Sequence, residues 1–277
     1  MDPLRTLLTQ ALDDDTLTAE HRRAAFDRFL VALSAGHLRT AANHDGTWRV
    51  DPLVKRAILL GFRLGRLTTF PNAGPLSFAD KDTYALQPLP LIERNIRIVP
   101  GGSAVRAGAY VGHNVTIMPP AYINVGAYVD DDTMIDSHAL VGSCAQVGKR
   151  CHISAAAQLG GVLEPIGTLP VIIEDDVFVG GNCGIYEGTL VRQGAVLASG
   201  TILTRGTTLF DNVHGRSYRA TPDGTLEVPP YAVVVPGSRA LPGPFAQSHQ
   251  LHTYAPIIVK YRDARTDRST ALEEALR

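Results

Sequence analysis

The sequence is poor in cysteine, with three in 277 residues and no Cys-X-X-Cys pair. An odd number of cysteines without that spacing argues against a disulfide framework and against a zinc site. Excess charge of either sign is also missing, because 26 Lys and Arg residues are balanced by 27 Asp and Glu residues. The formal net charge of −1 argues against bulk electrostatic attraction to nucleic acid or to a membrane surface.

Long hydrophobic runs are absent as well. No stretch reaches the roughly 20 apolar residues that span a bilayer, and the first residues lack a signal-peptide pattern. We therefore expect a cytoplasmic protein with neither a membrane nor a nucleic acid as its partner.

What the sequence does contain is a period of six. Every sixth residue in one long segment is a branched aliphatic, and the residue four places later is small or β-branched. The eleven aliphatic residues are Val99, Val105, Val111, Ile117, Ile123, Val129, Ile135, Val141, Val147, Ile153 and Leu159. Helices and strands have periods of 3.6 and 2, whereas a parallel β-helix is built from hexapeptide units. Three units are expected to close a triangular coil of about eighteen residues with the aliphatic side chains inside.

The period shifts by two residues and then resumes from Ile173 to Leu209. Cys151 and Cys183 fall in the small inward position, which predicts core packing. The break near 162–171 is too rich in proline and glycine for a flat face, and the break near 211–227 contains a Pro-Asp-Gly turn signal. We predict two extruded loops, which in a regular scaffold are often functional.

Two flanking parts complete the predicted organisation. Residues 1–94 are expected to be helical to about residue 70, with Asp51-Pro52 opening a helix that the Pro/Gly run at 71–75 ends, and then to form an irregular linker. This part either caps the open end of the column or helps to wall a substrate site. Residues 95–240 are assigned to the β-helix. Residues 241–277 are assigned to an extension with a strand at 257–259 and a short helix at 271–276.

A column of hexapeptide coils does not by itself identify a function. Three classes fit it: a coenzyme A-dependent acyltransferase, a metal-dependent lyase or hydratase, and a non-catalytic structural or binding solenoid. A metal site needs histidines that converge, but His113, His138 and His152 lie in different hexapeptides without paired spacing. We therefore predict that no metal is bound.

Several ordered strings are more specific than the repeat. They are MPPAYINVGAYVD at 118–130, TMID at 133–136, VGSCAQVGK at 141–149, GGVLEP at 160–165 and IIEDD at 172–176. Together they resemble the tetrahydrodipicolinate N-succinyltransferases, a family of hexapeptide-repeat acyltransferases, and the similarity extends over nearly the whole chain.

The resemblance implies a mainly β protein, a left-handed parallel β-helix with a helical N-terminal domain, assembled as a homotrimer with active sites between adjacent columns. It also implies transfer of succinyl from succinyl-CoA, as co-substrate and with no permanently bound cofactor, to the amine of L-2-amino-6-oxopimelate, the open form of tetrahydrodipicolinate. This reaction belongs to diaminopimelate and lysine biosynthesis. Transfer of acetyl from acetyl-CoA to the same or a related amino acid is the nearest alternative.

Asp136 is the leading catalytic candidate. It directly follows an inward isoleucine, at a corner where neighbouring units have glycine or a small polar residue, so it is expected to face a groove. It matches the catalytic aspartate of the family. Aminolysis of a thioester requires removal of a proton from the amine, a role that such a group fills as general base. The alternative is a corner aspartate that caps its own turn.

The other candidates concern binding. Arg97 matches the substrate arginine of the family, and a guanidinium can clamp a carboxylate, although a plain surface arginine is the alternative. Gly200 and Gly237 lie at corners where a pantetheine arm could approach the backbone closely. Lys260 is a candidate for a coenzyme A phosphate.

One position departs from the family. Many members have a glutamate where this chain has Gly184, in the string FVGGNCGIYE at 178–187, and that glutamate acts with the catalytic aspartate. Either Asp136 suffices, or Glu187 or another groove residue substitutes, or the activity has changed. His138 is a second candidate base because the pKa of histidine lies near neutrality.

Overall fold

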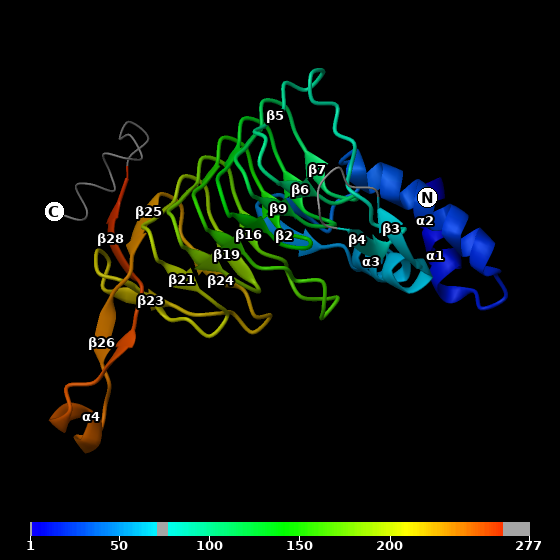
Figure 1. Ribbon diagram of the computed structural model, residues 1–277. Coiled ribbons are helices and arrows are strands. Elements are labelled where there is room, and N and C mark those ends of the chain that lie inside the picture. Colours follow the sequence, from blue (N-terminus) through cyan, green and yellow to red (C-terminus); the bar gives the residue numbers. More distant parts are fainter. Residues whose placement is uncertain (1, 71–76, 263–277) are drawn as a thin grey trace.

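A column of very short parallel strands forms the centre of the molecule (Figure 1). The computed structural model describes residues 2–70 and 77–262. The column has three faces, here called sheets 1, 2 and 3, and the chain visits them in turn, so each sheet contains every third strand. Within an uninterrupted coil, paired residues are eighteen apart, as in Met134 with His152, which confirms the predicted three-unit coil.

The strands of the column follow the hexapeptide period. Sheet 1 contains β7 (Tyr110–Val111), β10 (Tyr128–Val129), β13 (Gln146–Val147), β16 (Ile172–Ile173), β19 (Thr189–Val191) and β24 (Leu226–Val228). Sheet 3 contains β6 (Ala104–Val105), β9 (Tyr122–Ile123), β12 (Leu140–Val141), β15 (Gln158–Leu159), β18 (Gly184–Ile185) and β21 (Ile202–Leu203). Sheet 2 contains β5 (Arg97–Ile98), β8 (Thr116–Ile117), β11 (Met134–Ile135), β14 (His152–Ile153), β17 (Phe178–Val179), β20 (Val196–Leu197), β25 (Ala232–Val235), β28 (Ile257–Tyr261), β22 (Leu209–Asp211) and β23 (Arg216–Tyr218).

The predicted aliphatic positions form the core. From Val105 to Leu159 and from Ile173 to Leu209 they are all buried, and burial of each contributes about 1.5–3 kcal/mol. The first coil is an exception, since Ile98 and not Val99 pairs with Ile117. The prediction for Val99 is therefore wrong by one residue, because the chain enters the column from an irregular segment that does not keep the register.

The two breaks differ from each other. Residues 162–171 form a loop, as predicted, and the buried Lys55 amine donates a 2.6 Å hydrogen bond to the carbonyl of Thr168 in it. The second break is not a plain loop. β22 and β23 form an antiparallel hairpin, and β24 returns to sheet 1 next to β19.

The N-terminal part contains helices α1 (Pro3–Asp13), α2 (Ala19–Ser34) and α3 (Pro52–Leu64). Asp51 caps α3 by accepting hydrogen bonds from the amides of Leu53 and Val54, with Pro52 in the first turn, as predicted. The helix ends at Leu64 with Gly65 as its C-cap and not at the Pro/Gly run, which lies outside the described residues.

Two hairpins correct the expectation of helix to residue 70 and an irregular linker beyond it. β1 (Ala41–His44) pairs with β2 (Thr47–Val50), and β3 (Leu67–Phe70) pairs with β4 (Phe78–Lys81). Asp45 and Gly46 form the first turn with φ of 51° and 85°. An Asp-Gly pair is a strong hairpin signal, because the turn requires positive φ at both residues.

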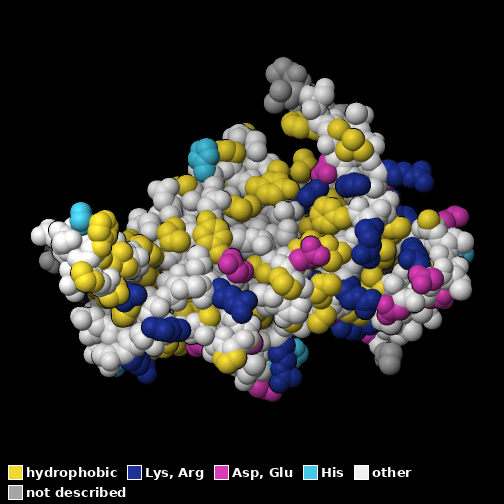
Figure 2. Space-filling model, turned by 90° about the horizontal axis from the view of Figure 1, so that it is seen from below, with side chains coloured by type: hydrophobic (Ala, Val, Ile, Leu, Met, Phe, Trp, Pro, Cys, Tyr) yellow, Lys and Arg dark blue, Asp and Glu magenta, His cyan; other side chains and the backbone are white. Residues whose placement is uncertain are grey.

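The helices pack against one corner of the column. Phe26, Phe29 and Ile58 share a buried cluster with Val125 and Cys144, which lie in turns between sheets 3 and 1. This contact leaves sheet 2 uncovered by the helices of the same chain. On the face shown in Figure 2, basic and acidic side chains gather over this helical end of the molecule.

The C-terminal extension leaves the column and returns to it. β26 (Ser238–Ala240) and β27 (His252–Tyr254) form an arm that carries the short helix α4 (Pro244–Ser248), which the sequence analysis did not predict (Figure 1). β28 then pairs with β25 and β22, which confirms the predicted strand at 257–259. The predicted helix at 271–276 lies outside the described residues. Within the described ranges, no helix has the length and apolar character that crossing a bilayer requires.

Candidate active site

Sheet 2 carries the principal candidates in one register. Each strand presents an outward residue beside an inward aliphatic one, and pairing aligns the outward residues into a row. In order along the sheet the row is Arg97, Thr116, Met134, His152, Phe178, Val196, Val233 and Lys260. Asp136 follows β11 directly, at the edge of this row.

The row places Asp136 between two cations. Neighbouring strands lie about 4.8 Å apart, so Arg97 is about 10 Å from the strand of Asp136 and Lys260 is about 24 Å away on the other side. Beyond His152 the row is apolar as far as Lys260, and here Val196 and Val233 are fully buried and contact Phe178 and Val259. Sheet 2 therefore offers an accessible carboxylate with a cation on either side along the row.

The Asp136 carboxylate is held by its surroundings. Its backbone amide donates to the carbonyl of Ile153 at 2.9 Å, which continues the sheet. Its Oδ1 accepts a 2.7 Å hydrogen bond from the amide of Ser137, so the turn-capping interpretation also applies. Its Oδ2 lies 3.8 Å from Nε2 of His152. The carboxylate side chain remains 30% exposed, so a ligand on sheet 2 can reach it.

His152 was not among the candidates from the sequence. The signal that could have found it is the eighteen-residue coil, which places it beside Met134 and hence next to Asp136. Its ring packs edge-on against Phe178, with centroids 5.1 Å apart.

His138, the second candidate base, lies in a turn and not in the row of sheet 2. It lies in the turn that leads from β11 to sheet 3, with a positive φ of 62° and an exposed side chain. Its amide donates to the carbonyl of Pro120 at 2.6 Å. Among the described residues no hydrogen bond or ion pair joins its ring to Asp136, so its role as a base stays a prediction.

Glu187 lies at another corner. It follows β18 in sheet 3 and is exposed, so one chain does not bring it to Asp136 on sheet 2. The ring of Tyr186 covers Gly184: a Cβ at Gly184 would lie 2.6 Å from Cε2 and 3.0 Å from the hydroxyl of that tyrosine. Tyr186 thus fills the space into which a side chain at 184 would extend, and sequence reasoning did not identify it.

Local structure explains why glycine occupies the two candidate positions 200 and 237. Gly200 has φ of +79° in the turn after β20, and a Cβ there would approach only Pro236, at 3.9 Å. A Cβ at Gly237 would lie 2.5 Å from Cδ1 of Ile257 and 2.7 Å from the carbonyl of Ala255. Gly237 is therefore required for packing of the C-terminal segment, and coenzyme A contacts at both glycines stay predictions.

The cysteines are not placed for nucleophilic chemistry. All three are free and buried, which confirms the prediction of core packing for Cys151 and Cys183. Burial raises the pKa of Cys144 to about 12 and that of Cys183 to about 11. Thiols with such pKa values are poor nucleophiles at neutral pH. No group of three or more His, Cys, Asp or Glu residues in the described part of the chain is arranged to hold a metal ion.

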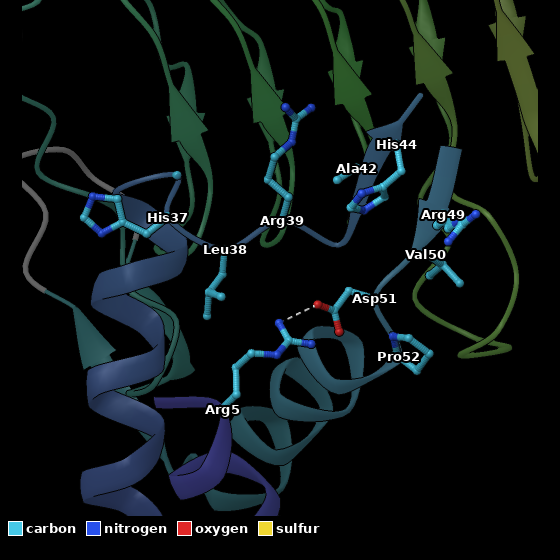
Figure 3. A pocket seen from close by; sticks show the side chains of 11 residues that line it. Arg5, His37, Leu38, Arg39, Ala42, His44, Arg49, Val50, Asp51 and Pro52 are labelled. Atoms are coloured by element: carbon cyan, nitrogen blue, oxygen red, sulfur yellow. Dashed lines mark hydrogen bonds and ion pairs between the residues drawn. The ribbon is translucent and has the colours of Figure 1, made fainter. Parts of the chain in front are cut away.

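A cavity of about 460 Å³ lies apart from sheet 2, between the N-terminal helices and the β1–β2 hairpin (Figure 3). Two of its cations are occupied by structural contacts. Arg39 stacks on Tyr128 at 3.7 Å and donates from Nε to Gln146, while Arg5 pairs with Asp51 at 2.7 Å. The cavity lies where the helical part meets sheet 1, and none of the candidate residues lines it.

Comparisons with known proteins agree with the architecture. A family model described as the N-terminal part of tetrahydrodipicolinate N-succinyltransferase matches residues 5–64, and one described as the hexapeptide repeat of succinyl-transferase matches residues 170–205.

Similar proteins extend over the whole chain. Proteins of Nitrobacter winogradskyi and Rhodopseudomonas palustris are each 41% identical, with 99% and 100% of this chain covered and 98% and 99% of those proteins. A protein of Bradyrhizobium diazoefficiens is 42% identical over 95% of this chain and 92% of its own. All three carry the name 2,3,4,5-tetrahydropyridine-2,6-dicarboxylate N-succinyltransferase.

Proposed function

The chain belongs to the tetrahydrodipicolinate N-succinyltransferase family, and from this we propose that it is an acyltransferase that moves succinyl from succinyl-CoA to the amine of L-2-amino-6-oxopimelate. The reaction serves diaminopimelate and lysine biosynthesis. The observation that carries the proposal is identity of about two residues in five over the full length of both chains, combined with an accessible Asp136 on sheet 2.

The chemistry follows from the geometry of Asp136. The substrate amine reaches the site mainly as an ammonium ion, which has no lone pair for attack. Asp136 binds the ammonium and takes part in removing a proton, which exposes the lone pair to the thioester carbonyl carbon. The new C–N bond forms, the C–S bond breaks, and coenzyme A leaves as a thiolate that takes up a proton. Overall two protons leave the nitrogen, one ending on sulfur and one in solvent.

The cations of sheet 2 fit the two substrates. Arg97, about 10 Å from the strand of Asp136, is placed for a carboxylate of the amino acid or of the succinyl group. Lys260, at the far end of the row, is placed for a phosphate of coenzyme A. We assign the pantetheine arm to the turns at Gly200 and Gly237, because Val196 and Val233 of the row are fully buried.

The assembly is proposed to be a homotrimer of left-handed coils. The support is that Asp136 and Glu187 lie at different corners of one column, on sheets 2 and 3. Side-by-side columns would bring the corner of one chain to the corner of the next and thereby form a groove. Sedimentation equilibrium should give three times the 29.7 kDa chain mass, and a monomer at assay concentrations would exclude this arrangement.

We assign the reaction to the cytoplasm. Three free, buried thiols suit a reducing compartment, where structural disulfides are rare.

The activity is tested by release of coenzyme A thiol with succinyl-CoA and an amino-oxopimelate substrate. We expect turnover with succinyl-CoA to exceed turnover with acetyl-CoA, and Asp136→Asn to lower kcat by about 10²–10⁴-fold with little change in the KM of the thioester. The matched control is Asp132→Asn, an exposed aspartate four residues earlier, which should leave the rate within twofold.

Two outcomes would count against this proposal. Faster turnover with acetyl-CoA would favour the acetyltransferase alternative. No turnover with either thioester, together with no heat of coenzyme A binding in calorimetry, would favour the non-catalytic solenoid that the glycine at 184 first suggested.

A further inference from the structure

The pair formed by Asp136 and His152 has a consequence beyond the assignment of Asp136. The two residues lie on adjacent strands of sheet 2, with Oδ2 of one 3.8 Å from Nε2 of the other. A carboxylate has an ordinary pKa near 4, so it cannot by itself hold a proton taken from an ammonium ion at neutral pH. The proton needs a second acceptor with a pKa closer to neutrality, and imidazole has this property.

We propose that His152 is the positioning residue of the site, which orients the Asp136 carboxylate and receives the proton that Asp136 removes from the substrate ammonium. This inference rests on the proposed function. The proton passes from the amine nitrogen to Oδ2 and then to Nε2 of neutral imidazole, and the imidazolium in turn releases the proton on Nδ1. No other atom changes its bonding in this step.

The sheet fixes both partners. Pairing of β11 with β14 sets Met134 opposite His152, and the amide of Ser137 holds Oδ1 of Asp136 at 2.7 Å. Oδ2 is therefore the oxygen directed toward the ring. Phe178, on the next strand, supports the other side of the imidazole. The His152 side chain is 35% exposed, but its Nε2 atom is buried and faces Oδ2 at 3.8 Å.

The charged and titratable groups around the pair, within the described ranges, are as follows. On the flanking strands, the neighbours in the same row are Thr116, Met134 and Phe178. The nearest row cation is Arg97, two strands away from β11.

In the surrounding turns, His138 follows Asp136 and is exposed. Arg150 and Asp176 precede β14 and β17, and they pair with each other at 2.8 Å. Asp136 is the carboxylate paired with His152 among these groups, at 3.8 Å.

The first test is the pH dependence of kcat/KM. Wild type should show an acidic limb, since only neutral imidazole accepts the proton. His152→Gln should lose this limb and lower kcat at pH 7 at least tenfold, with the KM of succinyl-CoA within twofold. The control is His113→Gln, which removes another histidine–aspartate pair, His113 with Asp131 at 3.4 Å, and should keep both rate and limb.

The second test is a double-mutant cycle. If His152 acts through Asp136, adding His152→Gln to Asp136→Asn should lower the rate no more than a further twofold. Independent, multiplying losses, or a His152→Gln enzyme with wild-type rate and pH profile, would overturn the inference while leaving the proposed function intact.

A third measurement does not need activity. In histidine NMR titrations of the full chain, Asp136→Asn should lower the pKa of the His152 imidazole by half a unit or more, because it removes the facing anion. An unchanged His152 pKa would refute the pair even if His152→Gln failed to fold. If wild type showed no turnover, the proposed function would fail, and this titration would still decide whether the pair exists.

Discussion

At the scale of single residues, Gly184 shows how a neighbour can determine residue choice. Tyr186 lies over it, and a Cβ at position 184 would come within 2.6 Å of that ring and 3.0 Å of Cδ1 of Ile202. We expect Gly184→Ala to lower the free energy of unfolding by about 1–3 kcal/mol through overpacking. The measurement is the urea midpoint at constant slope.

A double-mutant cycle with Tyr186→Ala tests whether the loss of stability comes from overpacking against this ring or from replacing a glycine as such. In the Tyr186→Ala background, Gly184→Ala should lower the free energy of unfolding by at least about 1 kcal/mol less than in wild type, since the two residues are in contact. Gly167→Ala is the control, because a Cβ there would contact nothing within 4 Å, and its effect should stay within about 0.5 kcal/mol. Equal losses for both alanine variants would contradict the packing explanation.

The candidate site was partly predictable for a residue-level reason. Asp136 stands out because it replaces a small corner residue in a repeat, and this is visible along the chain. His152 is visible only after folding, because it becomes a neighbour through pairing across a coil of eighteen residues. Tyr186 was missed because nothing in the sequence says that its ring turns back over Gly184.

At the scale of elements, the cap of α3 joins two parts of the N-terminal fold. Asp51 accepts from two amides of the first turn and also pairs with Arg5 of α1 at 2.7 Å. We expect Asp51→Ala to lower the free energy of unfolding by about 1–2 kcal/mol, with Asp51→Asn losing less because asparagine can still cap.

Asp2→Ala is the matched control for this cap. Asp2 also precedes a proline at a helix start, but in the described part of the chain its side chain accepts a single, exposed hydrogen bond, from the amide of Leu4 at 2.9 Å. Its loss should be the smaller one in denaturant unfolding. A loss for Asp2→Ala as large as that for Asp51→Ala would show that the link to Arg5 and the second capping bond contribute nothing.

Elements of the column were predictable because every hexapeptide repeats the same burial pattern. Many units therefore indicate the same strand register independently. The flanking elements had no such redundancy. Apolar residues at helical spacing on either side of 41–50 concealed a hairpin of two four-residue strands, although Asp45-Gly46 signalled it. The helix α4 is five residues long, too short for a periodic pattern to reveal.

At the scale of the whole molecule, the hydrogen bonds of one buried carboxylate, that of Asp211, link the strands at the C-terminal end of the column. Asp211 ends β22, and its fully buried side chain accepts hydrogen bonds from the Tyr261 hydroxyl at 2.8 Å and from Nδ1 of His214 at 2.9 Å. It also accepts from the amides of Val213 and His214 at 3.0 Å. These bonds join the β22–β23 hairpin to β28, so the terminal strand and the column share a single anion.

This anion predicts how stability depends on acid. Burial acts to raise the pKa of Asp211, but the hydrogen bonds from His214, Tyr261 and Val213 outweigh burial and lower it to about 2. Because the pKa in the folded state lies below the ordinary value of 3.8, the unfolded chain binds the proton first as pH falls. The contribution, about 2 kcal/mol, should be complete above about pH 5, decline between pH 4 and 2, and vanish below pH 2.

Asp211→Asn removes the ionisable group while keeping its size. At pH 7 we expect the variant to be less stable than wild type by about 2 kcal/mol, and the difference should shrink steadily as pH falls from 4 to 2. The measurement is the urea midpoint against pH at fixed protein concentration, since any assembly adds a concentration dependence. Glu93→Gln, at an exposed position before the column, should follow the wild-type curve. Parallel curves for wild type and Asp211→Asn between pH 2 and 5 would mean that closure of the column depends on β28 packing and not on this carboxylate.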